Sequence, residues 1–141
     1  MADLTITAAN MVAVSGTPLR GTALATITAG QPLYWDTTNG LFGPNVGLAD
    51  GNGSALLRTC VGISLHASLT GQPIAYLGTP GDVLGFGAIL TVNKIYITSL
   101  AVGMIAPDAD DAAGNYLQLL GVAITTSNLR LILYNSGVVT A

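Results

Sequence analysis

Two side chains of this sequence could act as a nucleophile or a base, and each is the only one of its type. The 141 residues contain one histidine, His66, and one cysteine, Cys60. A serine–histidine–aspartate site of the hydrolase type presents its serine in a Gly-x-Ser-x-Gly turn, and no serine here has those neighbours. Cys60 lies in an expected strand, where a small buried residue is typical. We therefore expect no catalytic residues, and we expect His66 to lie in a loop or at a strand end.

Two short acidic segments contain alternating oxygen ligands of the kind that calcium prefers. Residues 50–54 read Asp-Gly-Asn-Gly-Ser and residues 108–111 read Asp-Ala-Asp-Asp. An EF-hand loop also needs a glutamate at its twelfth position, and this chain contains no glutamate. Loops rich in Asp and Asn are usually turns. We expect turns at both segments and no bound metal or cofactor.

Two further patterns could bind a ligand. Gly85-Phe86-Gly87 lacks the third glycine and the lysine of a phosphate-binding loop, and it lies in an expected strand. A bulge or a close backbone approach explains its glycines better. The adjacent Tyr34 and Trp35 could stack on a sugar ring, although a place in the core or in an oligomer interface is the usual role of such residues.

The composition predicts an oligomer. Half of the residues are apolar and only 8% are charged, against roughly 25% in an ordinary globular protein. Such a chain has too few charged side chains to cover the surface of a monomer, and exposed apolar area usually marks a protein–protein contact. We expect an obligate homo-oligomer or a part of a larger assembly.

Charge and hydropathy exclude several classes. The net charge is −3, and the four cationic residues (Arg20, Arg58, Lys94 and Arg130) are scattered, so they cannot neutralise a run of phosphates. No apolar run reaches about 18 residues, and the start lacks the pattern of a signal peptide. We expect no nucleic-acid partner and no membrane partner. A single cysteine forms no internal disulfide, which is consistent with synthesis in a reducing cytoplasm.

The spacing of turn residues predicts an all-β fold. Short apolar stretches alternate with pairs such as Ser15-Gly16, Asn39-Gly40 and Pro80-Gly81. The expected strands lie near 11–15, 22–28, 32–36, 56–66, 73–78, 83–91, 94–98, 116–126 and 128–135. Asn39-Gly40 predicts a tight hairpin, and Asp108 could cap a short helix at 106–114. Regularly spaced short strands are typical of a barrel or sandwich.

The sequence also repeats itself. Residues 27–44 align without a gap on 90–107, so that Thr28, Gly40 and Pro44 match Thr91, Gly103 and Pro107. Residues 61–63 match 120–122, and 74–77 match 129–132. The offset therefore falls from 63 to 59 to 55 residues, as expected when loops vary and strands do not. We expect a single β-domain at 21–141, with an internal repeat of about 21–77 and 84–135.

Residues 1–20 have no counterpart in the second copy. Leu4 and Ile6 alternate with polar residues, so this segment can form a strand that adds to the edge of a partner's sheet. We expect an N-terminal arm outside the barrel that orders on a partner, with Leu4, Ile6, Met11 and Val12 as the docking residues.

The second copy resembles a known class of proteins. Residues 86–91, 95–99, 103–107, 120–127 and 129–131 together look like the small structural proteins of tailed bacteriophages, most closely the capsid decoration, or cement, proteins. The likeness covers roughly 83–135 and, more weakly, 20–77. It implies an all-β subunit with a small β-barrel or β-tulip-like domain, usually trimeric, that lies on the capsid exterior. In some members the N-terminal arm pairs with the major capsid protein, which by position would be residues 2–14 here.

The sequence therefore predicts a virion structural protein that binds the major capsid protein and its own copies. A phage tail or fibre module that binds a host receptor or glycan is the first alternative, and a small hydrolase or ligand-binding barrel is the second.

Overall fold

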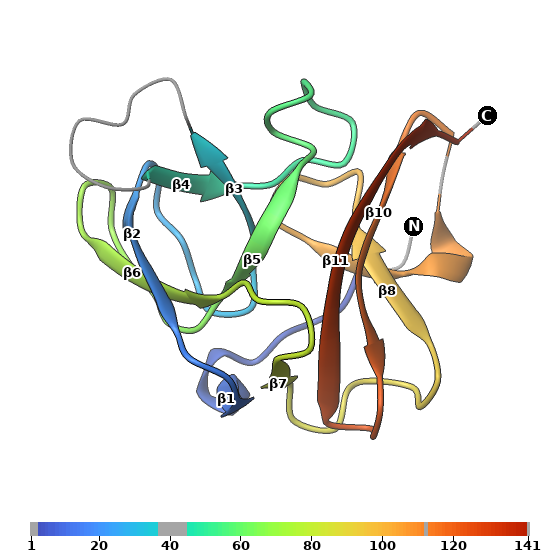
Figure 1. The fold of residues 1–141 in the computed structure, drawn as a ribbon, viewed down its shortest axis with the longest axis horizontal. Coiled ribbons are helices and arrows are strands. Elements are labelled where there is room, and N and C mark those ends of the chain that lie inside the picture. The colour runs from blue at the N-terminus through green and yellow to red at the C-terminus, as the bar shows by residue number, and fades with distance from the viewer. Residues whose placement is uncertain (1–2, 37–44, 112, 141) are drawn as a thin grey trace.

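The computed structural model describes residues 3–36, 45–111 and 113–140 and shows an all-β protein (Figure 1). The helical elements in this part of the chain are two short 3-10 turns, η1 (Ala8–Asn10) and η2 (Asp108–Asp110). The strands are β1 (Val12–Ser15), β2 (Leu19–Ala23), β3 (Pro32–Asp36), β4 (Asn45–Leu48), β5 (Cys60–Ser64), β6 (Pro73–Leu77), β7 (Val83–Gly85), β8 (Ile95–Thr98), β9 (Ile105–Pro107), β10 (Tyr116–Ala123) and β11 (Asn128–Val139). The expected fold class, all-β with a small barrel, is confirmed.

The first half of the molecule, β2 to β6, is a closed barrel. Its strands follow the order β2-β4-β3-β5-β6, and β2 returns to pair with β6. A short parallel pairing closes it, with Thr22 opposite Asn45 and Ala23 opposite Val46. The barrel is filled by a compact apolar cluster of Ala23, Ile27, Leu33, Val46, Ile74 and Tyr76. Alternating strand residues reach this interior, so the period-two pattern of the sequence positions the core.

The second half, β7 to β11, forms an open sheet with β1 at its edge. The order is β1-β7-β11-β10-β8-β9, and the barrel and the sheet lie side by side (Figure 1). One large apolar cluster joins them, because Cys60, Ile63 and Leu77 of the barrel pack with residues of the sheet such as Leu120 and Leu131. The Gln118 side-chain amide also donates to the carbonyl of Cys60 at 3.3 Å. The two halves therefore share a core.

The two halves repeat the same strand pairing. In the first, β3 pairs with β5 through Pro32–Ile63, Leu33–Gly62 and Tyr34–Cys60. In the second, β8 pairs with β10 through Ile95–Val122, Tyr96–Gly121 and Ile97–Leu119. Each residue of the second set lies 63 or 59 positions after its counterpart, as the sequence alignment indicates, and the bulge occurs at the same step.

The loop before each of these hairpins repeats as well. Gly30 and Asn93, 63 residues apart, both have positive φ, at 82° and 67°. Asparagine is the residue that best replaces glycine in this left-handed conformation. The Gly30 N–H donates to the Ser64 carbonyl at 2.9 Å, and the Asn93 N–H donates to the Ala123 carbonyl at 2.8 Å. Corresponding residues thus make the corresponding hydrogen bond.

The alignment holds less well at two places. Leu33 faces Leu48, whereas its counterpart Tyr96 faces Pro107, so the offset is already 59 at β4 and β9. The expected match of Pro107 to Pro44 therefore does not fit the pairing, although Gly40, Pro44 and the Asn39-Gly40 turn themselves lie outside the described residues. On the other side, β11 is shifted by two residues along β10, since Val122 faces Arg130 and not Ile132. A two-residue shift keeps every side chain on its face of the sheet.

The halves differ in closure. The interior residues correspond as Ala23 to Phe86, Ile27 to Leu90, Leu33 to Tyr96, Val46 to Ile105 and Ile74 to Leu129, and all of them are buried. In the barrel, Ala23 is small enough for β2 to pair with β4. The larger Phe86 stands at the equivalent position, and β7 and β9 are not paired with each other. The sheet therefore lacks the strand contact that closes the barrel.

Several expected elements need correction. The pattern missed β4 and β9, which are only four and three residues long, and it placed β2 at 22–28 where the strand is Leu19–Ala23. The helix expected at 106–114 is the turn η2, and Asp108 does not cap it: Pro107 is the cap residue and makes no side-chain capping bond. Short strands are specified by their neighbours in the sheet more than by their own sequence.

Candidate functional site

His66 has a structural role in the hairpin between β5 and β6. The Ala75 N–H donates to Nε2 at 2.9 Å, and Nδ1 lies 2.8 Å from the Ala67 carbonyl. This pattern fits a neutral ring that carries its proton on Nδ1. Both ring nitrogens are therefore occupied by backbone groups, and the ring braces the hairpin.

Cys60 is buried in the shared core. Burial raises the pKa of its thiol to about 12, and backbone hydrogen bonds of Gly62 and Leu33 only partly offset this. The thiol also donates to the Gly62 carbonyl at 3.2 Å. A reactive cysteine needs a thiolate and access to solvent. Cys60 therefore packs as a small apolar residue in the neutral form at ordinary pH.

The acidic segments are held by their own loops. Asp50 accepts from the Asn52 N–H at 3.3 Å. The Asp111 carboxylate accepts from the Asn115 amide at 2.7 Å and from the Thr140 hydroxyl. No group of three or more His, Cys, Asp or Glu side chains in the described ranges is placed to hold a metal ion. Near Asp50, Arg58 stacks 3.7 Å from the centre of the Tyr116 ring and ties this loop to β10.

Gly85, Phe86 and Gly87 serve packing. Gly85 ends β7 beside β1, where a Cβ would lie 2.8 Å from Val12 Cγ1, and Phe86 is fully buried. Gly87 has φ of 74°, and a Cβ there would lie 2.6 Å from Cβ of Asn10. These glycines allow another part of the chain to approach closely, which is the role expected for them.

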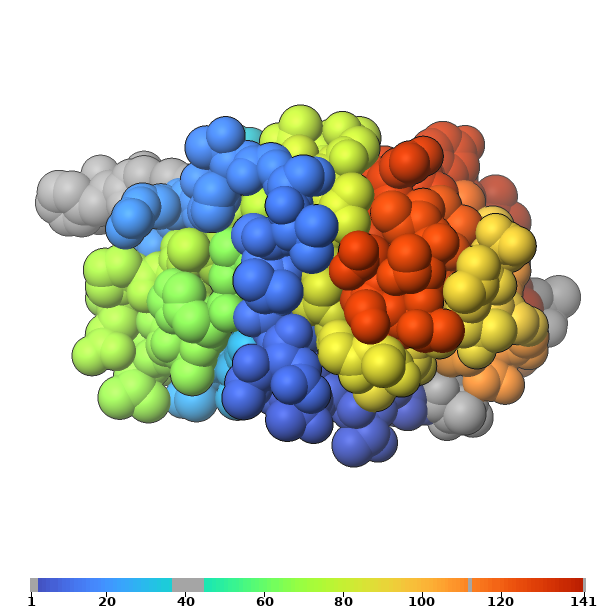
Figure 2. All heavy atoms as spheres, turned by 90° about the horizontal axis from the view of Figure 1, so that it is seen from below, coloured from blue at the N-terminus to red at the C-terminus, as the bar shows by residue number. Residues whose placement is uncertain are grey.

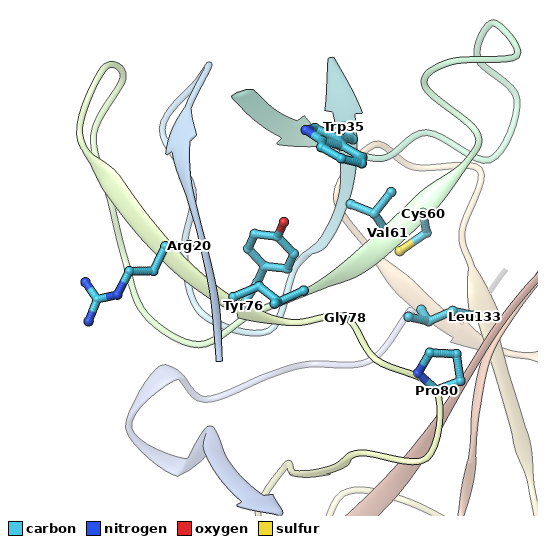
Figure 3. A pocket seen from close by; sticks show the side chains of 9 residues that line it. Arg20, Trp35, Cys60, Val61, Tyr76, Gly78, Pro80 and Leu133 are labelled. Carbon is cyan, nitrogen blue, oxygen red and sulfur yellow. The ribbon is translucent and has the colours of Figure 1, made fainter. Parts of the chain in front are cut away.

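A pocket of about 510 Å³ lies where the barrel meets β11 and is here called the Trp35 pocket (Figure 3). Trp35, Val61 and Tyr76 come from the barrel, Pro80 from the link to the second half and Leu133 from β11, and Leu19, Arg20, Cys60 and Gly78 complete the lining. In Figure 3 the guanidinium of Arg20 points away from Trp35 and Tyr76. Burial raises the pKa of Tyr76, so its hydroxyl stays uncharged. The lining can therefore hold an apolar or aromatic group.

Large apolar side chains are also exposed around this pocket and elsewhere. Trp35 is 47% exposed and Tyr134, next to Leu133 on β11, is 58% exposed. Further members of this set are Val12, Val14, Leu19, Leu69, Val92, Val102, Ile124, Val138 and Val139. Scattered single residues of this kind are normal, whereas a pocket rimmed by several of them is a candidate contact surface. The sequence indicated Trp35 but not its partners Pro80 and Leu133, which come from distant segments.

The N-terminal segment, residues 3–11, lies on the domain and not outside it. Figure 2 shows the blue N-terminal residues running between the green barrel strands and the yellow and red strands of the second half. Of the four expected docking residues, Leu4 and Ile6 pack partly buried against the shared core, Met11 is buried, and Val12 is 55% exposed in β1. Residues 19 and 20 belong to β2 of the barrel. The expectation of a separate arm at 1–20 therefore does not describe this structure, because apolar side chains in the segment are covered by the chain's own core.

The N-terminal segment takes the place of the missing closure. In the barrel, the Leu24 N–H donates to the Val46 carbonyl at 2.8 Å, beside the closing pair. The counterpart of Val46 is Ile105, and its carbonyl accepts from the Leu4 N–H at 2.7 Å. We call the groove between β7 and β9, walled by Gly30, Gly87 and Ile105, the seam. The N-terminal segment fills the seam. In a closed second barrel, pairing of β7 with β9 would have covered this place.

Comparisons with known proteins add no assignment to this geometry. No known protein family matches the chain, and no curated protein matches it significantly. Among the residues that the structure describes, no helix has the length and apolar character needed to cross a membrane.

Proposed function

We propose that this protein is a virion structural protein that decorates and stabilises a tailed-bacteriophage capsid. It binds the major capsid protein and further copies of itself on the capsid exterior, after synthesis in the cytoplasm of the host bacterium. Three features support the proposal: the resemblance of residues 83–135 to capsid cement proteins, the low charge of the chain, and an all-β domain.

The Trp35 pocket is the observation that carries the proposal furthest. It is apolar, it opens between two rigid β-structures, and Trp35 at its rim is about half exposed. Tryptophan and tyrosine dominate the free energy of protein interfaces when they enter or rim such pockets. A side chain of the capsid protein that fills this pocket would remove an exposed aromatic face from water.

The low charge supports self-association, and we propose a homotrimer. Only 8% of residues are charged, and large apolar side chains are exposed on both halves. A permanent interface buries on the order of 2,000 Å² or more in total. Sedimentation or light scattering that shows a stable monomer at micromolar concentration would contradict this part of the proposal.

Cosedimentation tests capsid binding directly. Purified protein is added to capsids assembled from the major capsid protein of the same phage, and the bound fraction is titrated to saturation. Trp35→Ala should weaken binding about tenfold or more, as expected for a central aromatic contact. Val92→Ala is the matched control, because Val92 is similarly exposed, at 44%, but does not line the pocket. Wild-type protein that fails to bind such capsids would reject the proposal.

A receptor-binding tail or fibre module is the second candidate, and the same pocket favours it. The ring of Trp35 is exposed beside Tyr76, and aromatic faces stack on sugars. Binding on a glycan array that disappears in Trp35→Ala, together with no capsid binding, would select this candidate.

A further inference from the structure

The seam is shaped for the N-terminal segment. A Cβ on Gly30 would lie 2.7 Å from Cγ2 of Ile6, and a Cβ on Gly87 would lie 2.6 Å from Cβ of Asn10. Only glycine at these two positions leaves room for the segment. Leu4 and Ile6 also line a small pocket with Ile105. The two glycines leave room for the side chains of Ile6 and Asn10, and the Ile105 carbonyl accepts from the Leu4 N–H, so this surface fits the segment closely.

Few polar contacts hold the segment in this groove. Among the described residues, the hydrogen bond from Leu4 to Ile105 is the backbone bond that ties residues 3–11 to the rest of the domain, and the bonds of Asn10 and Met11 close η1 within the segment. The apolar contacts of Leu4, Ile6 and Met11 supply the rest. Residues 3–11 are therefore held mainly by burial, and the adjoining β1 adds its pairing with β7 and the hydrogen bond from the Val83 N–H to the Ser15 hydroxyl.

Removal of the segment from the seam would cost free energy. Phe86 and Ile105 are fully buried beneath it, and Leu90 is nearly so. If residues 3–11 were to bind elsewhere, this apolar surface would meet water. The groove must therefore be filled again, and a segment of the same sequence fits it best.

The link that would have to open is three residues long. Gly16, Thr17 and Pro18 join β1 in the sheet to β2 in the barrel and are exposed. Gly16 has φ of 104°, and a Cβ there would lie 2.2 Å from Cγ of Asp82. Asp82 Oδ2 is buried without a hydrogen-bond partner, as is Asp3 Oδ1 at the far end of the segment. A short link limits how far the segment can move within its own chain, whereas an exchange between copies keeps each contact and opens only the hinge.

We infer that in the oligomer residues 3–15 of a second copy of this chain fill the seam of each subunit and pair their β1 with its β7, with the crossover at Gly16–Pro18. This inference rests on the self-association in the proposed function. It assigns the seam as the self-association surface and leaves the Trp35 pocket for the capsid. Extension of the hinge also brings the Asp82 carboxylate into water.

Chemical cross-linking of the full-length protein tests the exchange. Ile6 and Thr28 both line the small pocket beside the segment, so Ile6→Cys in one chain and Thr28→Cys in another are co-expressed with tags of different size. A short bis-maleimide is added at neutral pH, where the buried Cys60 does not react. Leu4→Cys replaces Ile6→Cys if that variant fails to fold. Tyr134→Cys replaces Thr28→Cys as the control, because Tyr134 does not line this pocket.

Exchange predicts a covalent heterodimer, at least about tenfold more abundant than with the Tyr134→Cys control. It also predicts covalent oligomers from the double variant with both cysteines in one chain. A double variant that cross-links only within single chains, while scattering shows an oligomer, overturns the exchange. Capsid cosedimentation of that same sample is independent of the result. If the cross-links form only within chains and the oligomer still saturates capsids, the exchange is rejected and the proposed function is not. If the chains are exchanged but the oligomer does not bind capsids, the proposed function is rejected and the exchange is not.

Discussion

The two halves have matching registers, yet one closes and the other does not. The barrel closes through Ala23 opposite Val46, whereas Phe86 and Ile105 occupy the equivalent positions in the second half and are not paired with each other. The same strand order therefore occurs once as a barrel and once as an open sheet, and the size of the side chain at positions 23 and 86 is the difference that we single out for testing. The open sheet then depends on residues 3–11 to cover its core, and the closed barrel does not.

Deletion of residues 2–14 should have the largest effect on this difference. It removes the buried Met11, the partly buried Leu4 and Ile6, and the pairing of β1 with β7. Each large apolar side chain contributes roughly 1.5–3 kcal/mol when fully buried. We expect a loss of about 5 kcal/mol in the free energy of unfolding, comparable to the whole stability of a small domain. Urea unfolding followed by far-ultraviolet circular dichroism measures it, and unchanged stability would show that the segment is a free arm after all.

Substitutions at the equivalent interior positions 23 and 86 should have the second-largest effect on stability. Phe86→Ala should cost about 3–5 kcal/mol, because a large buried ring leaves a cavity. Ala23→Phe should cost about 1–3 kcal/mol or more by overpacking the barrel where β2 pairs with β4. Denaturant midpoints of the two variants measure both. If Ala23→Phe were neutral, the size of this residue would not decide closure.

Truncation of single side chains in the N-terminal segment should have smaller effects. Leu4→Ala and Ile6→Ala should each cost about 1–2 kcal/mol, less than for full burial because both are partly exposed. Thr5→Ala is the matched control, since Thr5 is exposed between them, and should change stability by less than about 0.5 kcal/mol. Equal effects at all three positions would place the segment away from the core.

The pH dependence of stability tests the interface between the halves. Cys60 belongs to the shared core, and its pKa is raised from 9.0 to about 12 by burial. The neutral thiol is favoured in the folded state, so its contribution is complete below pH 9 and is lost as the pH rises from 9 toward 12. Between pH 8 and pH 10 we expect a loss of about 1 kcal/mol in unfolding free energy. Cys60→Ala should lack this component, and an identical pH profile in that variant would assign the loss to other groups.

The sequence predicted the fold class and an internal repeat, because turn residues and strand patterns are local signals. The offsets of 63 and 59 residues match the register of β3–β5 on β8–β10, and Gly30 and Asn93 mark the same left-handed turn. The missed strands β4 and β9 are short and are held by their neighbours in the sheet.

The site could be predicted only in part, because it depends on distant contacts. Trp35 was noted as a possible platform, but the pocket also needs Pro80 and Leu133. The alternation of Leu4 and Ile6 marked the apolar side chains of the segment, but nothing local showed that they pack against this chain's own core.

Amide hydrogen exchange at Leu4 tests most directly whether the N-terminal segment completes the second half. The Leu4 N–H donates to Ile105, whereas no hydrogen bond of the Thr5 N–H occurs among the described residues. If the seam is filled, by the same chain or by a second copy, the Leu4 amide hydrogen should exchange with solvent at least about 100-fold more slowly than that of Thr5. A stable hydrogen bond must open before the amide hydrogen can exchange. Exchange of Leu4 at the rate of an unfolded chain, equal to that of Thr5, would contradict the account.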